Sequence, residues 1–259
     1  MDLGIKGRKA LVCASSQGLG KACATALARE GCVVFINGRD EARLVNAVGD
    51  IFNATGVRVT PVVADLLTTS GRERLVAACP DTDILVNNNA GPPPGKLDEW
   101  DHAAWIDAFD RSMLPAILLV RALLPGMRQR RFGRIVNITS AMVKSPGPAM
   151  GLSTAARAAL TAVCKAISRE AVADNVTINN LLPYLVDTGR QRFLAERMVK
   201  LQGITLEEAR ARQAANVAAK RMGTAEEFAE ACAFLCGARA GYICGQNLQL
   251  DGGSYVGLV

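Results

Sequence analysis

A regular alternation of short aliphatic runs with longer helical patterns constrains this chain more than any other feature of its sequence. Seven runs rich in Val, Ile, Leu and Ala are predicted as β-strands, at residues 10–13, 33–36, 59–63, 84–86, 134–138, 176–180 and 247–250. Helical patterns lie between them at residues 19–30, 40–55, 70–78, 104–130, 154–173 and 225–235. Because strands separated by helices run parallel, we expect an α/β fold with a doubly wound parallel sheet of about seven strands.

The length and composition favour a single domain. With 259 residues, of which 50% are hydrophobic and 21% charged, the chain can bury one large core. Residues 191–219 interrupt the alternation with two apparent helices rich in Arg, Glu and Ala. Both a helical substrate lid, inserted around residues 190–220, and a solvated helical hairpin fit this pattern. We expect one domain over residues 1–259 that carries this insertion.

Cysteine and histidine usage argues against a metal site. The eight cysteines include no Cys-x-x-Cys pair, and His102 is the only histidine. The cysteines are interpreted as small buried residues of a protein in the reducing cytoplasm. The apolar stretch 116–124 is short and is interrupted by Arg121, so we expect neither a membrane span nor a signal peptide.

A net charge of +6 raises the question of an anionic partner. The densest basic run, residues 128–131, lies at the predicted end of a long helix, where cations complement the helix dipole. Aromatic residues make up only 5% of the chain and none lies within that run, so base stacking has no support. We expect no nucleic-acid partner and interpret the run as a solvated helix terminus.

A glycine-containing turn follows the first predicted strand and leads into a helix. Gly18 and Gly20 let the backbone approach a pyrophosphate, while the start of the helix offers amide donors and a positive dipole. In this context the turn predicts a dinucleotide site of Rossmann type. The other residues of the turn expected to contact the cofactor are Ser15, Ser16, Gln17 and Leu19.

Three further motifs complete a family pattern. They are Asn88-Asn89-Ala90-Gly91 after the fourth strand, the run from Gly133 to Ser140, and Asp251-Gly252-Gly253 near the end. Together with the glycine turn, they make the chain resemble the short-chain dehydrogenase/reductase family over essentially its whole length. The resemblance implies a cytoplasmic oxidoreductase of the ketoreductase kind, acting on a small-molecule carbonyl or alcohol. It also implies a homo-oligomer, either a dimer or a homotetramer.

The resemblance also identifies cofactor contacts, and two residues depart from it. The family's glycine turn begins Thr-Gly, whereas this chain has Cys13 and Ala14. An alanine there costs about 1 kcal/mol if its φ must be positive. The fourth-strand motif matches residues 88–91 literally, although the spacing of the chain also allows 87–90. The implied cofactor contacts are Asp65, Leu66, Asn88, Ala90, Gly91, Arg157, Pro183 and Thr188.

Arg39 follows the second strand at the position that decides between the two nicotinamide cofactors. NAD-preferring members of the family carry an acid there, which accepts from the ribose hydroxyls and would repel a 2′-phosphate. Arg39 can instead pair with that phosphate through two N–H groups. We therefore expect NADP(H) as the cofactor, with a solvated loop cation as the alternative reading.

The proton-transfer positions differ from the family pattern. Of the family's serine, tyrosine, lysine and asparagine, only the serine is present, as Ser140; by spacing, Ser153 replaces the tyrosine, Arg157 the lysine and Ser112 the asparagine. An aliphatic hydroxyl titrates too high to replace a phenol, and a guanidinium stabilises an alkoxide but does not pass a proton. The alternative is that Ser153 or Thr154 only caps a helix and Arg157 is a surface residue.

Tyr184 stands in the segment that resembles the family's Pro-Gly-x-x-x-Thr loop over the nicotinamide, in place of the glycine. One hypothesis is that its phenol has taken over proton donation, since a phenol has a suitable pKa. The other is that its ring fills the space left by the missing tyrosine. Lys144 is a further acid expected nearby.

We expect an NADP(H)-dependent oxidoreductase that interconverts a carbonyl, in a small ketone or a 3-oxoacyl group, and an alcohol. One alternative is a non-redox lyase or dehalogenase-like enzyme on the same scaffold that uses Ser140 and Arg157. The other is a catalytically silent subunit that binds nucleotide, for which the loss of tyrosine and lysine is the supporting feature. Fold does not decide among them.

Overall fold

The computed structural model describes residues 2–258 and has a seven-stranded parallel sheet at its centre. Its strands lie in the order β3-β2-β1-β4-β5-β6-β7, and all six neighbouring pairs run parallel. The strands are β1 (Lys9–Val12), β2 (Val33–Gly38), β3 (Thr60–Val63), β4 (Ile84–Asn87), β5 (Gly133–Ile138), β6 (Val176–Pro183) and β7 (Asn247–Leu250). The doubly wound parallel sheet expected from the sequence is thus confirmed.

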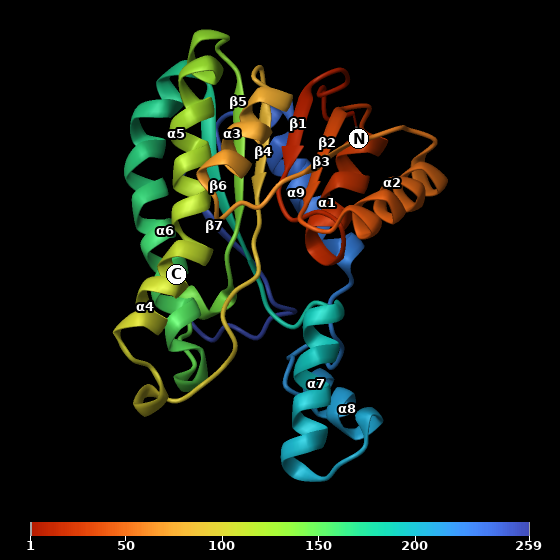
Figure 1. Ribbon diagram of the computed structural model, residues 1–259, viewed down its shortest axis with the longest axis vertical. Helices are drawn as coiled ribbons and strands as arrows, with labels where there is room; N and C mark the ends of the chain where they lie inside the picture. Colours follow the sequence, from red (N-terminus) through yellow and green to blue (C-terminus); the bar gives the residue numbers. More distant parts are fainter. Residues whose placement is uncertain (1, 259) are drawn as a thin grey trace.

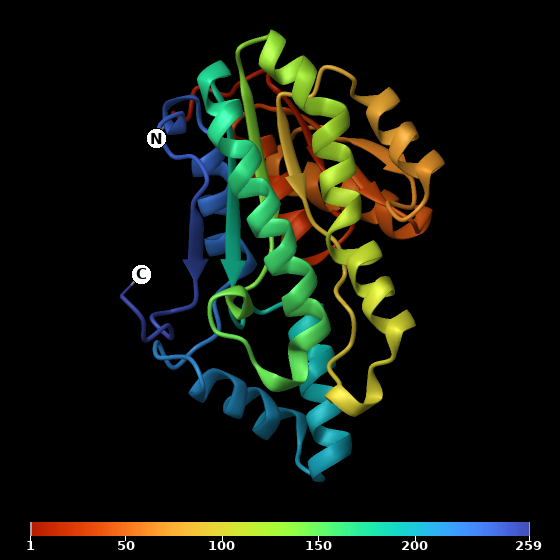
Figure 2. The ribbon, with the colours of Figure 1, turned by 90° about the vertical axis from the view of Figure 1, so that its left-hand side faces the viewer.

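Helices cover both faces of the sheet (Figure 1). The helices are α1 (Gly18–Arg29), α2 (Glu41–Thr55), α3 (Thr69–Ala78), α4 (His102–Ser112), α5 (Leu114–Gln129), α6 (Gly151–Ala171), α7 (Gly189–Gln202), α8 (Leu206–Ala215) and α9 (Ala225–Cys236). One apolar core lies between the sheet and α1, α2 and α9, and a second between the sheet and α3, α5 and α6. Figure 2 shows α5 and α6 side by side across the second face.

The single helix expected over residues 104–130 is wrong, because the segment forms two helices that meet at Met113. Pro115 has no N–H to donate to the carbonyl of Arg111, four residues earlier, so the hydrogen-bond ladder breaks there. The Asn89 side chain supplies the missing donor, with its Nδ2 2.6 Å from the Arg111 oxygen. Asn89 thereby joins the end of α4 to the loop that follows β4.

The basic run at residues 128–131 lies at the carboxyl end of α5, as expected. Arg128 and Arg131 both pair with Asp174, and Arg130 lies near Asp83. All eight cysteines are free, and all except Cys244 are buried, which agrees with their interpretation as small core residues. In residues 2–258 no helix is long and apolar enough to cross a membrane, and no cluster of His, Cys, Asp and Glu could hold a metal ion.

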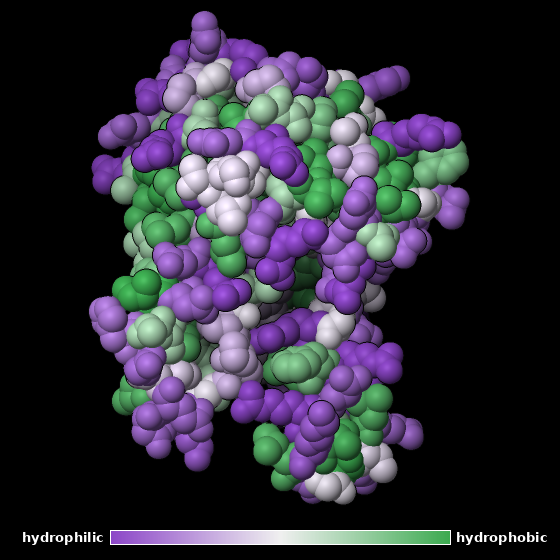
Figure 3. Space-filling view, viewed as in Figure 1, coloured by the Kyte–Doolittle hydropathy of each residue, from purple (hydrophilic) through white to green (hydrophobic). Residues whose placement is uncertain are grey.

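The two helices expected within residues 191–219 are present as α7 and α8. They form a hairpin that projects beyond the end of the sheet, at the bottom of Figures 1 and 2. The space-filling view shows the surface hollowed between the body of the molecule and this hairpin, with hydrophilic residues around the hollow (Figure 3). The hairpin therefore overhangs the edge where the strands end.

Candidate functional site

The strand order changes direction between β1 and β4, and this point is where doubly wound sheets bind their ligands. The glycine turn follows β1 at this place, the asparagine-rich loop follows β4, and Ser140 follows β5. Segments far apart in the sequence therefore meet at one edge of the sheet.

The backbone of the glycine turn restricts which residues can stand at two of its positions. A Cβ added at Gly20 would lie 2.5 Å from the Ala14 carbonyl oxygen and 2.9 Å from the Asn88 side-chain nitrogen, so only glycine fits. Ala14 has φ of 43°, in the left-handed region that favours glycine. Ala14 therefore has the positive φ at which an alanine costs about 1 kcal/mol relative to glycine.

The start of α1 fits a phosphate group. Gln17 precedes the helix without a side-chain capping bond, so the first amides keep their donors for a ligand. Gly18 has φ of 57°, and Thr188, from the loop after β6, lies against it: a Cβ at Gly18 would be 3.9 Å from the Cβ of Thr188. The expected contacts Gly18 and Thr188 are thus brought together. Leu19 is partly buried and packs against the core.

Ser15 supports the turn from within. It is fully buried, and its hydroxyl donates to the Val12 oxygen at 2.7 Å and accepts from the Asn37 amide at 2.9 Å. Ser15 therefore ties β1 to β2. Ser16 is partly exposed, and its Oγ would lie 3.4 Å from a Cβ added at Gly38, the residue before Arg39.

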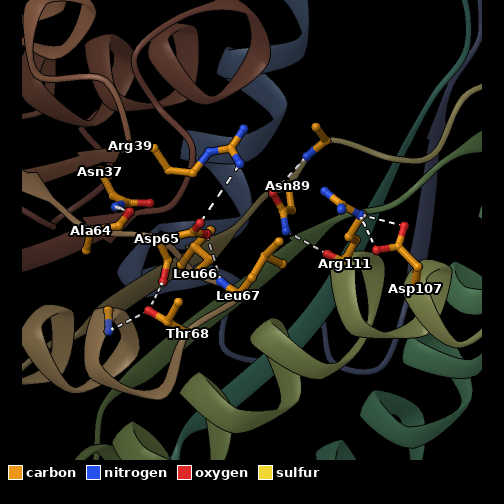
Figure 4. Close-up of polar contacts among 12 residues, drawn as sticks. Asn37, Arg39, Ala64, Asp65, Leu66, Leu67, Thr68, Asn89, Asp107 and Arg111 are labelled. Carbon is orange, nitrogen blue, oxygen red and sulfur yellow. Dashed lines mark hydrogen bonds and ion pairs between the residues drawn. The ribbon is translucent and has the colours of Figure 1, made fainter.

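Arg39 and Asp65 face each other at the ends of β2 and β3 (Figure 4). Nη1 of Arg39 lies 3.9 Å from Oδ2 of Asp65, and 66% of the Arg39 side chain is exposed. Such an exposed pair contributes about 0–1 kcal/mol, so it leaves the guanidinium available to a phosphate. Asp65 also accepts from the amide of Leu67 at 3.0 Å. The residues of this corner therefore fit a ribose 2′-phosphate, with Ser16 and Arg39 as its donors.

The three consecutive asparagines after β4 have different partners. Asn87 donates to the Asn137 side chain on β5 at 2.9 Å, and Asn88 donates to the Ala14 carbonyl at 3.1 Å. Asn89 turns toward the end of α4 (Figure 4). Ala90 is exposed, and its amide donates to Asn89 at 2.9 Å. Asn88 therefore holds the glycine turn, and it is the first residue of the motif when the motif is matched to residues 88–91.

Gly91 lies against two predicted catalytic positions. A Cβ at Gly91 would be 3.1 Å from Ser153 Oγ and 3.2 Å from Arg157 Nη2. Ser153 is buried in the first turn of α6, and the N-cap of this helix is Met150, so the reading of Ser153 or Thr154 as a helix cap is wrong. Helical periodicity brings Ser153 and Arg157 to the same side of α6.

The Arg157 side chain contacts the backbone next to Ser140, at the end of β5. Nη1 of Arg157 donates to the carbonyl of Thr139, the residue before Ser140. Arg157 is partly buried and lines a cavity, so it is not a free surface cation. Burial of its guanidinium lowers the pKa of Arg157 to about 10, with a further contribution from Arg190, and it stays charged at neutral pH. Ser140 Oγ accepts from the Met142 amide at 3.2 Å, which leaves its own proton free to donate.

A cavity of about 20 Å³ lies beside Arg157. This volume has room for one water molecule. Ser112 and Asn87 line it, and within residues 2–258 neither Ser112 Oγ nor Asn87 Oδ1 has a hydrogen-bond partner. Leu66 forms part of its apolar wall. Ser112 and Arg157 thus line the same cavity.

Tyr184 lines a second cavity, of about 200 Å³, with Val217, Phe228 and Asp251. Among the described residues, the two cavities have no lining residue in common. Pro183 precedes Tyr184 at the end of β6 and pairs with Leu250 on β7. The Lys144 ammonium lies 5.0 Å from the ring centroid of Tyr255. Proton donation by Tyr184 therefore stays a prediction.

Two residues of α7, Arg190 and Arg197, contact the loop after β4. The sequence prediction did not include them among the site residues. Their guanidiniums donate to the carbonyls of Pro92 and Pro94, at 3.1 and 3.0 Å. Their spacing of seven residues, two helical turns, was the available signal, since it puts both on one side of a helix.

Comparisons with known proteins agree with this geometry. A family model described as enoyl-(acyl carrier protein) reductase matches residues 13–255. The NADPH-dependent reductase BacG of Bacillus subtilis is 32% identical over 95% of this chain and 97% of its own length. The 3-oxoacyl-[acyl-carrier-protein] reductase FabG of Escherichia coli is 30% identical over 98% of this chain and 100% of its own length. The structure of L-sorbose reductase from Gluconobacter frateurii, complexed with NADPH and L-sorbose, superposes with a TM-score of 0.94 at 30% identity, and the match covers 100% of both chains.

Proposed function

Because the chain belongs to the short-chain dehydrogenase/reductase family, we propose that it is an NADP(H)-dependent oxidoreductase that reduces the carbonyl of a small ketone or a 3-oxoacyl group. The names of its relatives support the reaction type, since they include NADPH-dependent, 3-oxoacyl and L-sorbose reductases. We further propose that the active site is atypical, because serine and arginine stand at the family's tyrosine and lysine positions.

One observation carries the proposal. Arg157 donates to the Thr139 carbonyl, directly before Ser140, on the same edge of the sheet as the glycine turn. A hydroxyl donor and a permanent cation therefore lie together where the nicotinamide end of a dinucleotide would reach. This pair suits a reaction in which negative charge develops on a carbonyl oxygen.

The cofactor, when bound, supplies a hydride to the carbonyl carbon. Ser140 Oγ orients the substrate by donating to its carbonyl oxygen. Arg157 stabilises the developing alkoxide, and its remaining N–H groups hold the nicotinamide ribose. Ser16 and Arg39 hold the 2′-phosphate, while the amides at the start of α1 hold the pyrophosphate.

The proton has two proposed sources. One is the phenol of Tyr184. The other is a water molecule in the small cavity beside Arg157, where Ser112 Oγ and Asn87 Oδ1 are free to bind it. The separation of Tyr184 into the second cavity favours the water route.

A catalytically silent nucleotide-binding subunit is the second candidate. The observation in its favour is that Ser153 Oγ and the Arg157 guanidinium both lie against Gly91, which leaves little space at the positions that carry proton transfer in the family. A silent subunit would bind the cofactor at the same site but would not catalyse the reduction. The α7–α8 hairpin as a substrate lid, a homo-oligomeric state and a cytoplasmic location are further proposals for either candidate.

A ketone and alcohol panel assayed with both nicotinamide cofactors tests the proposal. We expect the purified chain alone to oxidise NADPH in the presence of at least one ketone or 3-oxoacyl thioester. NADPH binding without turnover on any member of the panel would favour the silent subunit. Failure to bind NADPH would contradict both candidates.

A further inference from the structure

Three arginines converge on the loop that follows β4. Arg157 Nη2 lies 3.2 Å from the position of a Cβ at Gly91, Arg190 donates to Pro92 and Arg197 donates to Pro94. They come from two helices, α6 and α7, so the loop is held between the body of the molecule and the hairpin. We call these three residues the arginine triad.

The triad has no acidic partner. Other arginines nearby in the sequence or fold form ion pairs, for example Arg192 on α7 with Glu196 at 3.1 Å and Arg111 on α4 with Asp107 at 2.6 Å. Within residues 2–258 no member of the triad lies within 4.0 Å of a carboxylate. Gathering cations without a counter-charge costs free energy, so the site is arranged for an anion that the chain itself does not supply.

The guanidiniums keep donors for that anion. Each carries five N–H groups, and one carbonyl contact occupies one of them. Residues 92–94 are all proline, so they accept hydrogen bonds and cannot donate any. The loop therefore orients the arginines through its carbonyls without adding amide donors of its own.

Arg190 lies between the other two members of the triad, because its charge acts on the pKa of Arg157 and the charge of Arg197 acts on the pKa of Arg190. Arg190 is exposed, whereas Arg197 and Arg157 are partly buried. Burial lowers the pKa of Arg157 most, and the nearby charge of Arg190 lowers it further, which is the effect expected of like charges held close together. An anion bound between the hairpin and the loop would contact Arg190 and Arg197 and lie close to Arg157, whose Nη1 donates to the carbonyl before Ser140.

We propose that Arg190 and Arg197, with Arg157 behind them, recognise an anionic head group, a carboxylate or a phosphate, on the carbonyl substrate. This inference rests on the proposed function, because it gives a substrate class to the same site. Arg190 and Arg197 are specificity residues that bind the head group, while Ser140 remains the contact of the reacting carbonyl. Guanidinium is suited to this role because its planar N–H pairs match carboxylate and phosphate oxygens.

Calorimetric titration of the full chain, saturated with NADP⁺, tests the proposal with two matched pairs of probes. Acetoacetate is compared with methyl acetoacetate, and dihydroxyacetone phosphate with dihydroxyacetone. We expect at least one anion to bind about tenfold or more tightly than its neutral partner, as charge-assisted pairs do. The two pairs distinguish a carboxylate site from a phosphate site.

Variants of α7 assign the preference to the triad. The double variant Arg190→Gln/Arg197→Gln should lose the preference for the anion, and Arg190→Lys/Arg197→Lys should retain part of it. Arg192→Gln is the matched control, because Arg192 lies on the same helix and pairs with Glu196. It should retain the full preference, and a thermal melt of each variant verifies that it is folded.

Three results would overturn the inference. They are equal binding of anion and neutral partner, the same loss of preference in Arg192→Gln, and a loss of NADPH affinity in the double variant, which would assign these arginines to the cofactor phosphates. The proposed function fails differently. Anion binding without reduction of any ketone would contradict the reductase alone, and reduction of neutral ketones with no anion preference would contradict the triad alone.

Discussion

We propose that the two sides of the ligand crevice differ in how closely they follow the family to which the chain belongs. On the side of β1 to β3, glycine is kept where a Cβ would collide with the Ala14 carbonyl, and Arg39 stands at the cofactor-selecting corner. On the side of β5 and β6, the atypical site that we propose has serine or arginine at three of the four positions that the family pattern assigns to proton transfer. Nucleotide binding relies mainly on backbone amides and tolerates sequence change, whereas proton transfer relies on the pKa of single side chains.

The largest expected effect is that of Ser140→Ala. Removal of one donor to a developing oxyanion typically lowers the rate by about 10²–10³-fold. NADPH affinity should stay the same, because Ser140 belongs to the substrate side of the crevice. Steady-state kinetics and a fluorescence titration measure the two quantities; a variant that keeps its activity within a few fold would make Ser140 a structural residue.

Arg39→Asp tests the nucleotide side. A charge-assisted hydrogen bond to the phosphate contributes on the order of 1.5–3 kcal/mol, so NADPH affinity should fall by about tenfold or more. NADH affinity should be retained or rise, since an acid can accept from the ribose hydroxyls. An unchanged ratio of the two dissociation constants would show that Arg39 is only a solvated cation.

Ala14→Gly has a smaller effect, on stability. Alanine at φ of 43° costs about 1 kcal/mol, and the extra freedom of glycine in the unfolded chain offsets about 0.5–1 kcal/mol of the relief. We expect a net gain below about 1 kcal/mol, which raises the melting temperature by roughly 2–4 °C at most. A lower melting temperature would mean that the alanine methyl makes a compensating contact.

Tyr184→Phe is expected to have the smallest effect. Its ring lines the second cavity with Val217 and Phe228, so phenylalanine preserves the packing. If water beside Arg157 supplies the proton, turnover and the pH–rate profile should both be unchanged. A large loss of turnover, with a shifted basic limb of that profile, would instead assign proton donation to Tyr184.

Much of the fold was predictable because the aliphatic runs of a parallel sheet are buried on both faces and stand out in the sequence. The break between α4 and α5 was missed although Pro115 marks it, because proline is also tolerated in the first turn of a helix, where it lies here. The positive φ of Ala14 could be stated only as a condition, since an alanine carries no sign of that conformation.

The candidate site was predictable where a motif fixes a position and not where distant segments meet. Ser112, Ser153 and Arg157 follow from spacing, and they lie near Gly91 or in the cavity beside it. The location of Tyr184 in a separate cavity depends on the direction of its side chain, which periodicity within one short loop does not specify. The convergence of Arg190 and Arg197 on Pro92 and Pro94 joins residues about a hundred positions apart.

The most direct test of the contrast between the two sides is a fluorescence titration of NADPH and NADH into the wild type and Ser140→Ala. We predict that both proteins bind NADPH about tenfold or more tightly than NADH, with equal NADPH dissociation constants, while turnover by Ser140→Ala is about 10²–10³-fold lower than that of the wild type. A wild-type protein that binds neither cofactor, or binds both equally, would contradict the claim that the nucleotide side is kept while the proton-transfer side is rebuilt.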